Sequence, residues 1–211
     1  MASKQYLVRY WRRHLYCPCF ILGNAPSILD HDLSLLKDYF TVGVNRIFKL
    51  YDPTILLWQD ESFLKSEKID HLKAIKFCRD TVDPENKYYH YHRVMKPFKF
   101  ANTTHILYGT GNTGILAVQF AVALGCKPII LLGMDCNVTD VTDFYGDNKY
   151  WNDHTLKYCV NALEFIKEHC PVEIISCDDT KFWEQQKLED VIAKLNVCPA
   201  GRQMYNRMLG I

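Results

Sequence analysis

The sequence has no apolar run of the roughly 18 residues that a membrane-spanning helix needs. Near its start, charges at Lys4 and Arg9 occupy the stretch where a secretory signal would be apolar. Neither sign of charge is in excess, because 25 basic and 24 acidic side chains leave a formal net charge of +1. The one basic cluster, residues 9–14, is short, so there is no strong signal for nucleic-acid binding. These absences predict a cytoplasmic protein with no membrane partner.

Regularly spaced cysteine pairs are also missing. The nine cysteines are an odd number at irregular intervals, unlike the even set of a disulfide framework. Cys17 and Cys19 have neither the spacing nor the second pair that a zinc site needs. His90 and His92 lie in a tyrosine-rich stretch that predicts an aromatic strand or loop rather than a metal site. The sequence therefore predicts buried thiols that stay reduced in an intracellular compartment.

Short apolar runs alternate with amphipathic segments, which is typical of an α/β protein with a parallel sheet. The length fits one domain, residues 1–211 with a core from about 18 to 195, at roughly 150 residues per domain. Strands are predicted at 19–23, 40–44, 54–58, 73–78, 105–108, 128–133 and 172–176, with the strand at 128–133 in the centre of the sheet. Helices are predicted at 28–36, 115–124, 155–169 and 182–195. Residues 80–104 and 136–153 have no clear period and are predicted to be irregular or lid-like.

An open parallel sheet binds ligands beyond the carboxyl ends of its strands, so polar residues after each strand are the candidate site. These residues are Gly23, Asn24, Ser27, Asn45, Gln59, Asp60, Asn112, Thr113 and Asp135. Two glycine-bearing turns, 23–27 and 109–114, each lead into a helix N-terminus, where backbone N–H groups and the helix dipole favour a phosphate. The second turn matches G-x-G-x-x-G by letters, although close helix–sheet packing explains its glycines equally well. Together the turns indicate a nucleotide.

Several of these segments carry a family resemblance. Residues 21–28 (ILGNAPSI), 44–46 (VNR), 111–114 (GNTG), 131–135 (LLGMD), 152–154 (NDH) and 161–165 (NALEF) resemble the bacterial family 42 sialyltransferases. The first segment and the LLGMD strand end are also similar to the archaeal-type 6-hydroxymethylpterin diphosphokinases (MptE-like), and to phage proteins related to both. The resemblance covers residues 20–176. It implies a Rossmann-like domain with helices on both faces of a mostly parallel sheet.

The sialyltransferase resemblance implies a CMP-activated sugar as the donor, and no metal. It places Asn24 and Asn45 near the nucleotide and its phosphate, and Thr113 near the donor. It makes His154 the general base, and an imidazole suits removal of a proton from an acceptor hydroxyl. Without the resemblance, His154 is better interpreted as a surface residue. Tyr145 and Tyr150 are candidates, by position, for stabilising the departing phosphate.

The acidic residues after the third strand favour a different reaction. Where the sialyltransferases have an uncharged asparagine–proline pair, this chain has Gln59-Asp60-Glu61. In a diphosphokinase, Asp60 and Asp135 would hold Mg²⁺ on a nucleoside triphosphate, although roles as caps and turn formers fit them equally well. Three functions stay open: a CMP-sugar glycosyltransferase, a magnesium-dependent pterin-type diphosphokinase, and a nucleotide-binding protein without catalysis. The acceptor, the transferred group and assembly into a homo-oligomer also stay open, as does the host cytoplasm as location for a phage-encoded protein.

Overall fold

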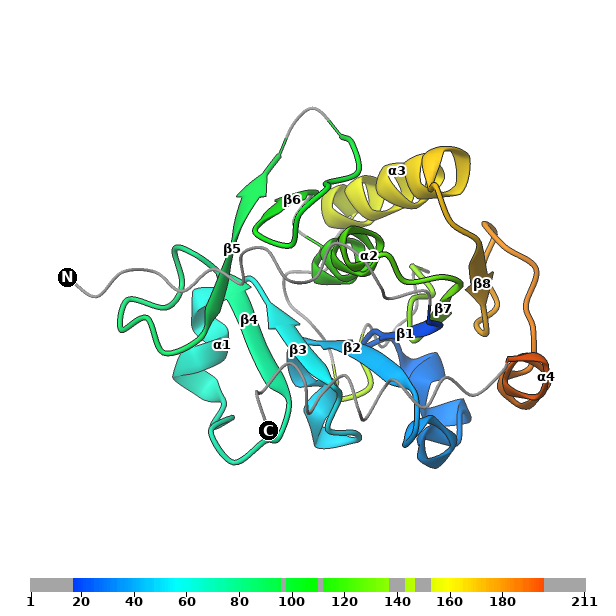
Figure 1. Cartoon of the computed structure of the whole chain (residues 1–211), viewed down its shortest axis with the longest axis horizontal. Coiled ribbons are helices and arrows are strands. Elements are labelled where there is room, and N and C mark those ends of the chain that lie inside the picture. The colour runs from blue at the N-terminus through cyan, green and yellow to red at the C-terminus, as the bar shows by residue number, and fades with distance from the viewer. Residues whose placement is uncertain (1–16, 96–97, 110–111, 137–142, 147–152, 196–211) are drawn as a thin grey trace.

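The fold is a single eight-stranded sheet with helices on both faces (Figure 1). The computed structural model describes residues 17–95, 98–109, 112–136, 143–146 and 153–195. The strands are β1 Cys19–Leu22, β2 Phe40–Val44, β3 Ile55–Trp58, β4 Ile75–Arg79, β5 Tyr89–Val94, β6 Ile106–Tyr108, β7 Ile129–Leu132 and β8 Ile174–Ser176. The α-helices are α1 Glu61–Ser66, α2 Thr113–Leu124, α3 Asp153–His169 and α4 Leu188–Lys194. The short 3-10 helices are η1 Pro26–Asp30, η2 Leu33–Leu36 and η3 Asn45–Lys49.

All neighbouring strands run parallel, in the order β6-β5-β4-β3-β2-β1-β7-β8. The carboxyl ends of all strands therefore lie at one edge of the sheet. The chain builds the sheet outward from β1 to β6 in one direction and then returns to add β7 on the other side of β1. This reversal between β1 and β7 is the topological switch point, where open α/β sheets bind ligands.

Each face of the sheet has its own apolar core. Buried residues of α2 and α3 pack on one face, and ten of the twelve residues of α2 are buried. The other face is covered by residues of α1, α4 and the three 3-10 helices. The predicted α/β architecture with helices on both faces is confirmed. In the part of the chain that the structure describes, no helix is both long and apolar enough to cross a membrane.

The structure corrects several of the predicted elements. Residues 80–104 are not irregular throughout, because β5 forms there and pairs with β4 and β6. The strand predicted at 128–133 is present as β7 but lies next to the edge strand β8 rather than in the centre. The helix predicted at 28–36 is two separate 3-10 helices, the second capped by Asp32, which accepts a hydrogen bond from the Ser34 N–H. The last helix begins at Leu188, later than predicted.

The prediction that all cysteines are reduced thiols is wrong for one pair. Cys136, just after β7, and Cys159, on α3, form a disulfide. The pair was missed because the packing of α3 over the end of β7 brings the two residues together, and no local spacing signals such a contact. The other described cysteines are not in disulfides. Cys198 lies outside the described residues.

The ends of β1 and β7 approach too closely for any side chain at position 23. The Gly23 N–H donates to the Leu132 carbonyl at 2.7 Å, and a Cβ built on Gly23 would lie 2.0 Å from the Gly133 carbonyl oxygen. We expect Gly23→Ala to lower the free energy of unfolding by about 3 kcal/mol, because backbone rather than a flexible side chain must move. Chemical denaturation with circular dichroism measures this loss. An unchanged denaturation midpoint would contradict it.

Candidate nucleotide site at the strand ends

Two asparagines lie at the carboxyl ends of the adjacent strands β1 and β2. Asn24 is 7% exposed, and its Nδ2 donates to the Val44 carbonyl at 3.1 Å. Asn45 begins η3 with a φ of 49°, in the left-handed region that asparagine tolerates better than most residues. Among the described residues, the Oδ1 atoms of both side chains are buried and have no hydrogen-bond partner. A buried acceptor left unpaired costs about 1–3 kcal/mol, and each of these oxygens can accept a hydrogen bond from a ligand.

A second group of polar residues joins β3, β5 and the start of α2. Gln59 is buried, and its Nε2 donates to Thr113 Oγ1 at 3.1 Å while its Oε1 accepts a hydrogen bond from Arg93. Asn112 caps α2, because its Oδ1 accepts from the Ile115 N–H at 3.2 Å. Thr113 is therefore held in the first turn of α2, where the backbone N–H groups and dipole of a twelve-residue helix favour an anion.

Charges of both signs lie beside this group. Burial lowers the pKa of Arg93, and the neighbouring Arg79 lowers it further. Asp60 is exposed, but partial desolvation of its carboxylate raises its pKa, while Arg79 and Arg93 act in the opposite direction. The ends of β3, β4 and β5 thus bring one carboxylate near two guanidinium groups.

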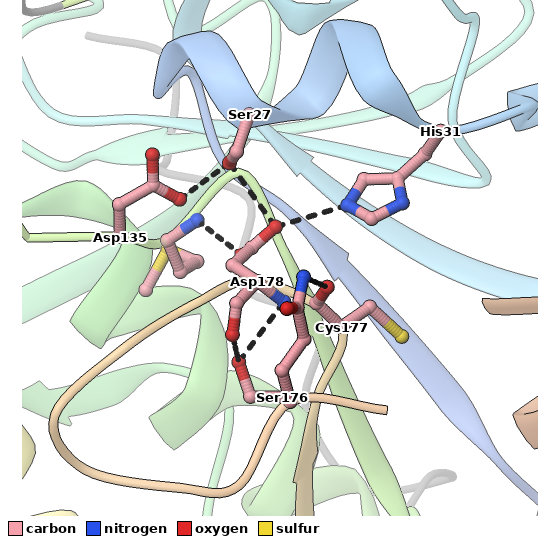
Figure 2. A network of polar contacts seen from close by, with 8 residues as sticks. Ser27, His31, Asp135, Ser176, Cys177 and Asp178 are labelled. Atoms are coloured by element: carbon pink, nitrogen blue, oxygen red, sulfur yellow. Dashed lines mark hydrogen bonds and ion pairs between the residues drawn. The ribbon is translucent and has the colours of Figure 1, made fainter. Parts of the chain in front are cut away.

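A third cluster occupies the switch point itself (Figure 2). The Ser27 hydroxyl lies within hydrogen-bond distance of Asp135 and of Asp178 Oδ1, the latter at 3.1 Å. Asp178 is 1% exposed and also contacts His31 Nε2 at 3.0 Å and accepts from the Met134 N–H at 2.9 Å. Burial raises the pKa of Asp135 to about 6, the Ser27 hydrogen bond lowers it, and the Asp178 carboxylate raises it. The Ser27 hydroxyl therefore lies between two carboxylates, and the His31 imidazole contacts the second of them, Asp178.

Asp135→Asn is expected to remove a pH-dependent change in stability between about pH 4 and pH 6. The pKa of Asp135 is about 6 in the folded protein, whereas an unfolded aspartate titrates at about 4. The folded state holds the proton more tightly, so this contribution to stability is fully present below about pH 4 and is lost as the pH rises through about 6. The melting temperature of the wild type should therefore fall relative to that of the variant across this window. Asp190→Asn, at an exposed position on α4, is the control, and its melting temperature should change with pH as that of the wild type does. If the melting temperature of Asp135→Asn also changed with pH as that of the wild type does, Asp135 would not be the group responsible.

Asp60 and Asp135 are not brought together. Asp60 follows β3 and Asp135 follows β7, and β2 and β1 lie between these strands. Neighbouring strands are about 4.8 Å apart, so these strand ends are separated by about 14 Å, too far for two carboxylates to bind one ion directly. The carboxylate beside Asp135 is Asp178 instead. Magnesium binding that involves Asp60 and Asp135 stays a prediction.

The turn at residues 143–146 lies against Asn24. The Phe144 N–H donates to the Asn24 carbonyl at 2.8 Å, and the Arg46 guanidinium lies 5.0 Å from the centre of the Tyr145 ring. Burial raises the pKa of Tyr145, and the neighbouring Asp143 raises it further. The turn thus contacts the backbone of Asn24, and the Tyr145 ring lies beside Arg46, the residue that follows Asn45. Tyr150 lies outside the described residues.

His154 is exposed in the first turn of α3. Its ring makes an edge contact with that of Tyr158, at 4.7 Å between centroids. Because α3 connects β7 to the parallel strand β8, its N-terminus lies toward the carboxyl edge of the sheet. Cys159, five residues further along α3, forms the disulfide with Cys136. Its Sγ also accepts a hydrogen bond from Asn112 Nδ2 at 3.2 Å. The start of α3 is therefore tied to the start of α2 and to the end of β7.

Three polar residues at this edge were not among those predicted from the sequence: His31, Arg93 and Asp178. Asp178 follows the strand predicted at 172–176, so the rule that found the other residues would have found it. Arg93 lies on β5, for which the sequence left a strand and a loop open. His31 follows η1, and no pattern in the sequence distinguishes it from other surface histidines.

No protein-family model and no curated protein sequence matches the chain. The MAf glycosyltransferase from Magnetospirillum magneticum AMB-1 matches with a TM-score of 0.63 and 17% identity, over 98% of this chain and 37% of that one. The sialyltransferase CST-II, crystallised with a trisaccharide acceptor and CMP, matches with a TM-score of 0.52 and 16% identity, over 80% of this chain and 85% of that one. The α-2,3-sialyltransferase Cst-I from Campylobacter jejuni matches with a TM-score of 0.49 and 16% identity over 98% of both chains.

The chain thus spans little more than a third of the length of the MAf protein. At these identities the two matches with TM-scores above 0.5 establish a shared fold. The likeness to the pterin diphosphokinases stays a prediction. The chain has the α/β fold found in glycosyltransferases, including sialyltransferases.

Proposed function

We propose that the protein is a glycosyltransferase that uses a nucleotide-activated sugar, with a CMP-sugar as donor and His154 as general base. The observation that carries the proposal is the pair of buried Oδ1 atoms of Asn24 and Asn45, at the ends of adjacent strands, which have no hydrogen-bond partner within the described parts of the chain. Carboxamide oxygens accept hydrogen bonds, so they suit the amino group of a base or the hydroxyls of a ribose rather than a phosphate. A nucleoside supplies both kinds of donor.

The remaining parts of a nucleotide-sugar find matching chemistry beside this pair. The N-terminus of α2 at Thr113 suits the phosphate, because its backbone N–H groups point out of the helix. The Tyr145 hydroxyl is protonated at neutral pH, as any tyrosine is, and is proposed to donate to a departing phosphate. The two matches with TM-scores above 0.5 support the same class of reaction: one is a glycosyltransferase, and the other is a sialyltransferase crystallised with CMP and an acceptor.

Nucleotide binding distinguishes the three functions that the sequence left open. We expect CMP and CDP to raise the melting temperature by mass action, with or without Mg²⁺, and GTP and ATP to have no such effect. The protein should also release CMP from a CMP-sugar in excess chelator. Stabilisation by GTP or ATP only with Mg²⁺ would favour the diphosphokinase, and CMP binding without turnover would favour a non-catalytic protein. If none of these nucleotides binds, the proposal is wrong.

A further inference from the structure

We propose that Cys78, Asp83 and His90 form a binding site for a zinc-type divalent metal ion, separate from the nucleotide crevice. Their possible ligand atoms all lie within 4.8 Å of one another. Cys78 and His90 are fully buried, and Asp83 is 3% exposed. In a tetrahedral zinc site the ligand atoms are about 3.5 Å apart, so small side-chain movements bring all three into bonding range.

Local structure fixes each of the three side chains. The parallel register of β4 and β5 places Cys78 directly opposite His90, so their side chains share one face of the sheet. The connection from β4 turns back at Val82, whose N–H donates to the Arg79 carbonyl at 3.0 Å. That turn places the Asp83 carboxylate against the two strands, where Oδ2 accepts from the Tyr88 N–H at 2.9 Å and lies 3.2 Å from His90 Nε2.

The chemistry of the three groups selects the class of ion. A thiolate, an imidazole and a carboxylate are the ligands of zinc-type ions, whereas Mg²⁺ and Ca²⁺ prefer sets composed of oxygens. If Asp83 bound through both oxygens, the ion would have four donor atoms, in a geometry distorted from a tetrahedron because the two oxygens of one carboxylate lie close together. A divalent ion would also neutralise the two negative charges of the thiolate and the carboxylate. Such compensation is needed because an unpaired charge is costly to bury.

A metal at this position would hold the β4–β5 connection on the sheet. The cluster spans the end of β4, the following turn and the start of β5. Further along β5, the Tyr91 hydroxyl donates to the Trp58 carbonyl at 3.0 Å and Arg93 contacts Gln59. The expected role is structural, since all three residues are shielded from solvent. Metal binding at this cluster does not depend on the proposed transferase activity.

Cobalt binding tests the site directly, because Co²⁺ replaces zinc-type ions and absorbs in the near ultraviolet when a thiolate is bound to it. After chelator treatment, Co²⁺ should bind the full-length protein with this thiolate band and a stoichiometry of one. Zn²⁺ should displace it and raise the melting temperature. Cys78→Ser should abolish the thiolate band. His90→Gln should weaken binding by at least roughly 100-fold, since it removes a ligand rather than a supporting hydrogen bond.

Cys126→Ser is the matched control. Cys126 is also a fully buried cysteine, but it lies on the opposite face of the sheet with Cys17 and Cys19. This variant should keep the thiolate band. Circular dichroism establishes that each variant is folded, and Asp83→Asn gives a third test if a variant at the other two positions does not fold. Absence of the thiolate band in the wild type, or its persistence in folded Cys78→Ser, would show that the three residues form only a hydrogen-bonded cluster.

Discussion

Replacing His154 with alanine is expected to lower turnover of a CMP-sugar by roughly 10² to 10⁴-fold, the usual contribution of a general base. The affinity for CMP should stay nearly unchanged, because the imidazole would act on the acceptor hydroxyl and not on the nucleotide. The side chain is exposed in the first turn of α3, so its loss should cost little stability. Steady-state kinetics of CMP release, together with CMP binding by calorimetry, measure both quantities.

His169→Ala is the control for this variant. His169 is a second exposed histidine on the same helix, at the end away from the carboxyl edge of the sheet. Its replacement should leave turnover unchanged. Equal turnover in His154→Ala and the wild type would remove His154 as the base. The nucleotide part of the proposal would then still rest on Asn24 and Asn45.

Asn24→Ala is expected to weaken CMP binding by about 10- to 100-fold, which corresponds to about 1–3 kcal/mol for one buried hydrogen bond. The substitution removes the Oδ1 acceptor and also the Nδ2 bond to Val44, so some stability should be lost as well. Calorimetry well below the melting temperature of the variant separates the two effects. Asn45→Ala should weaken binding in the same direction, because its Oδ1 is likewise buried without a partner among the residues described.

Asn102→Ala provides the comparison. Asn102 is exposed just before β6, at the amino edge of the sheet and away from the carboxyl ends of the strands. Its replacement should leave CMP affinity at the wild-type value. Wild-type affinity in both Asn24→Ala and Asn45→Ala would mean that a nucleotide, if bound, sits elsewhere.

The sequence predicted most strands to within two residues, because apolar runs bounded by turn residues are a local signal. β2 has the predicted bounds of 40–44, and β7 lies inside the predicted 128–133. For β5 the sequence left open an aromatic strand or a loop, because Tyr-His-Tyr-His-Arg-Val has too little apolar character to predict a strand alone. Its strand conformation depends on neighbours β4 and β6, which no local pattern identifies.

Site residues were predictable to the extent that they follow strands. The order of the strands was not predictable, and it decides which of those residues meet. Asp135 lies beside Asp178 because β8 is the neighbour of β7, and it lies far from Asp60 because two strands intervene. The Gln59–Arg93 contact joins segments that are distant in sequence, which is why its arginine was missed.

The position of β1 between β2 and β7 has a consequence for how the chain is made. One neighbour of β1, β2, follows it closely in the chain. The other neighbour, β7, whose Ile129 pairs with Cys19, is synthesised much later. At typical ribosomal rates, the delay between the synthesis of β2 and that of β7 is roughly 5 to 20 s. During this time one edge of the fully buried strand Cys19–Leu22 has no pairing partner, which is the condition under which nascent sheets aggregate. We therefore expect nascent chains stalled before β7 to be captured by chaperones that bind extended apolar segments, and chains extended through β8 to be released.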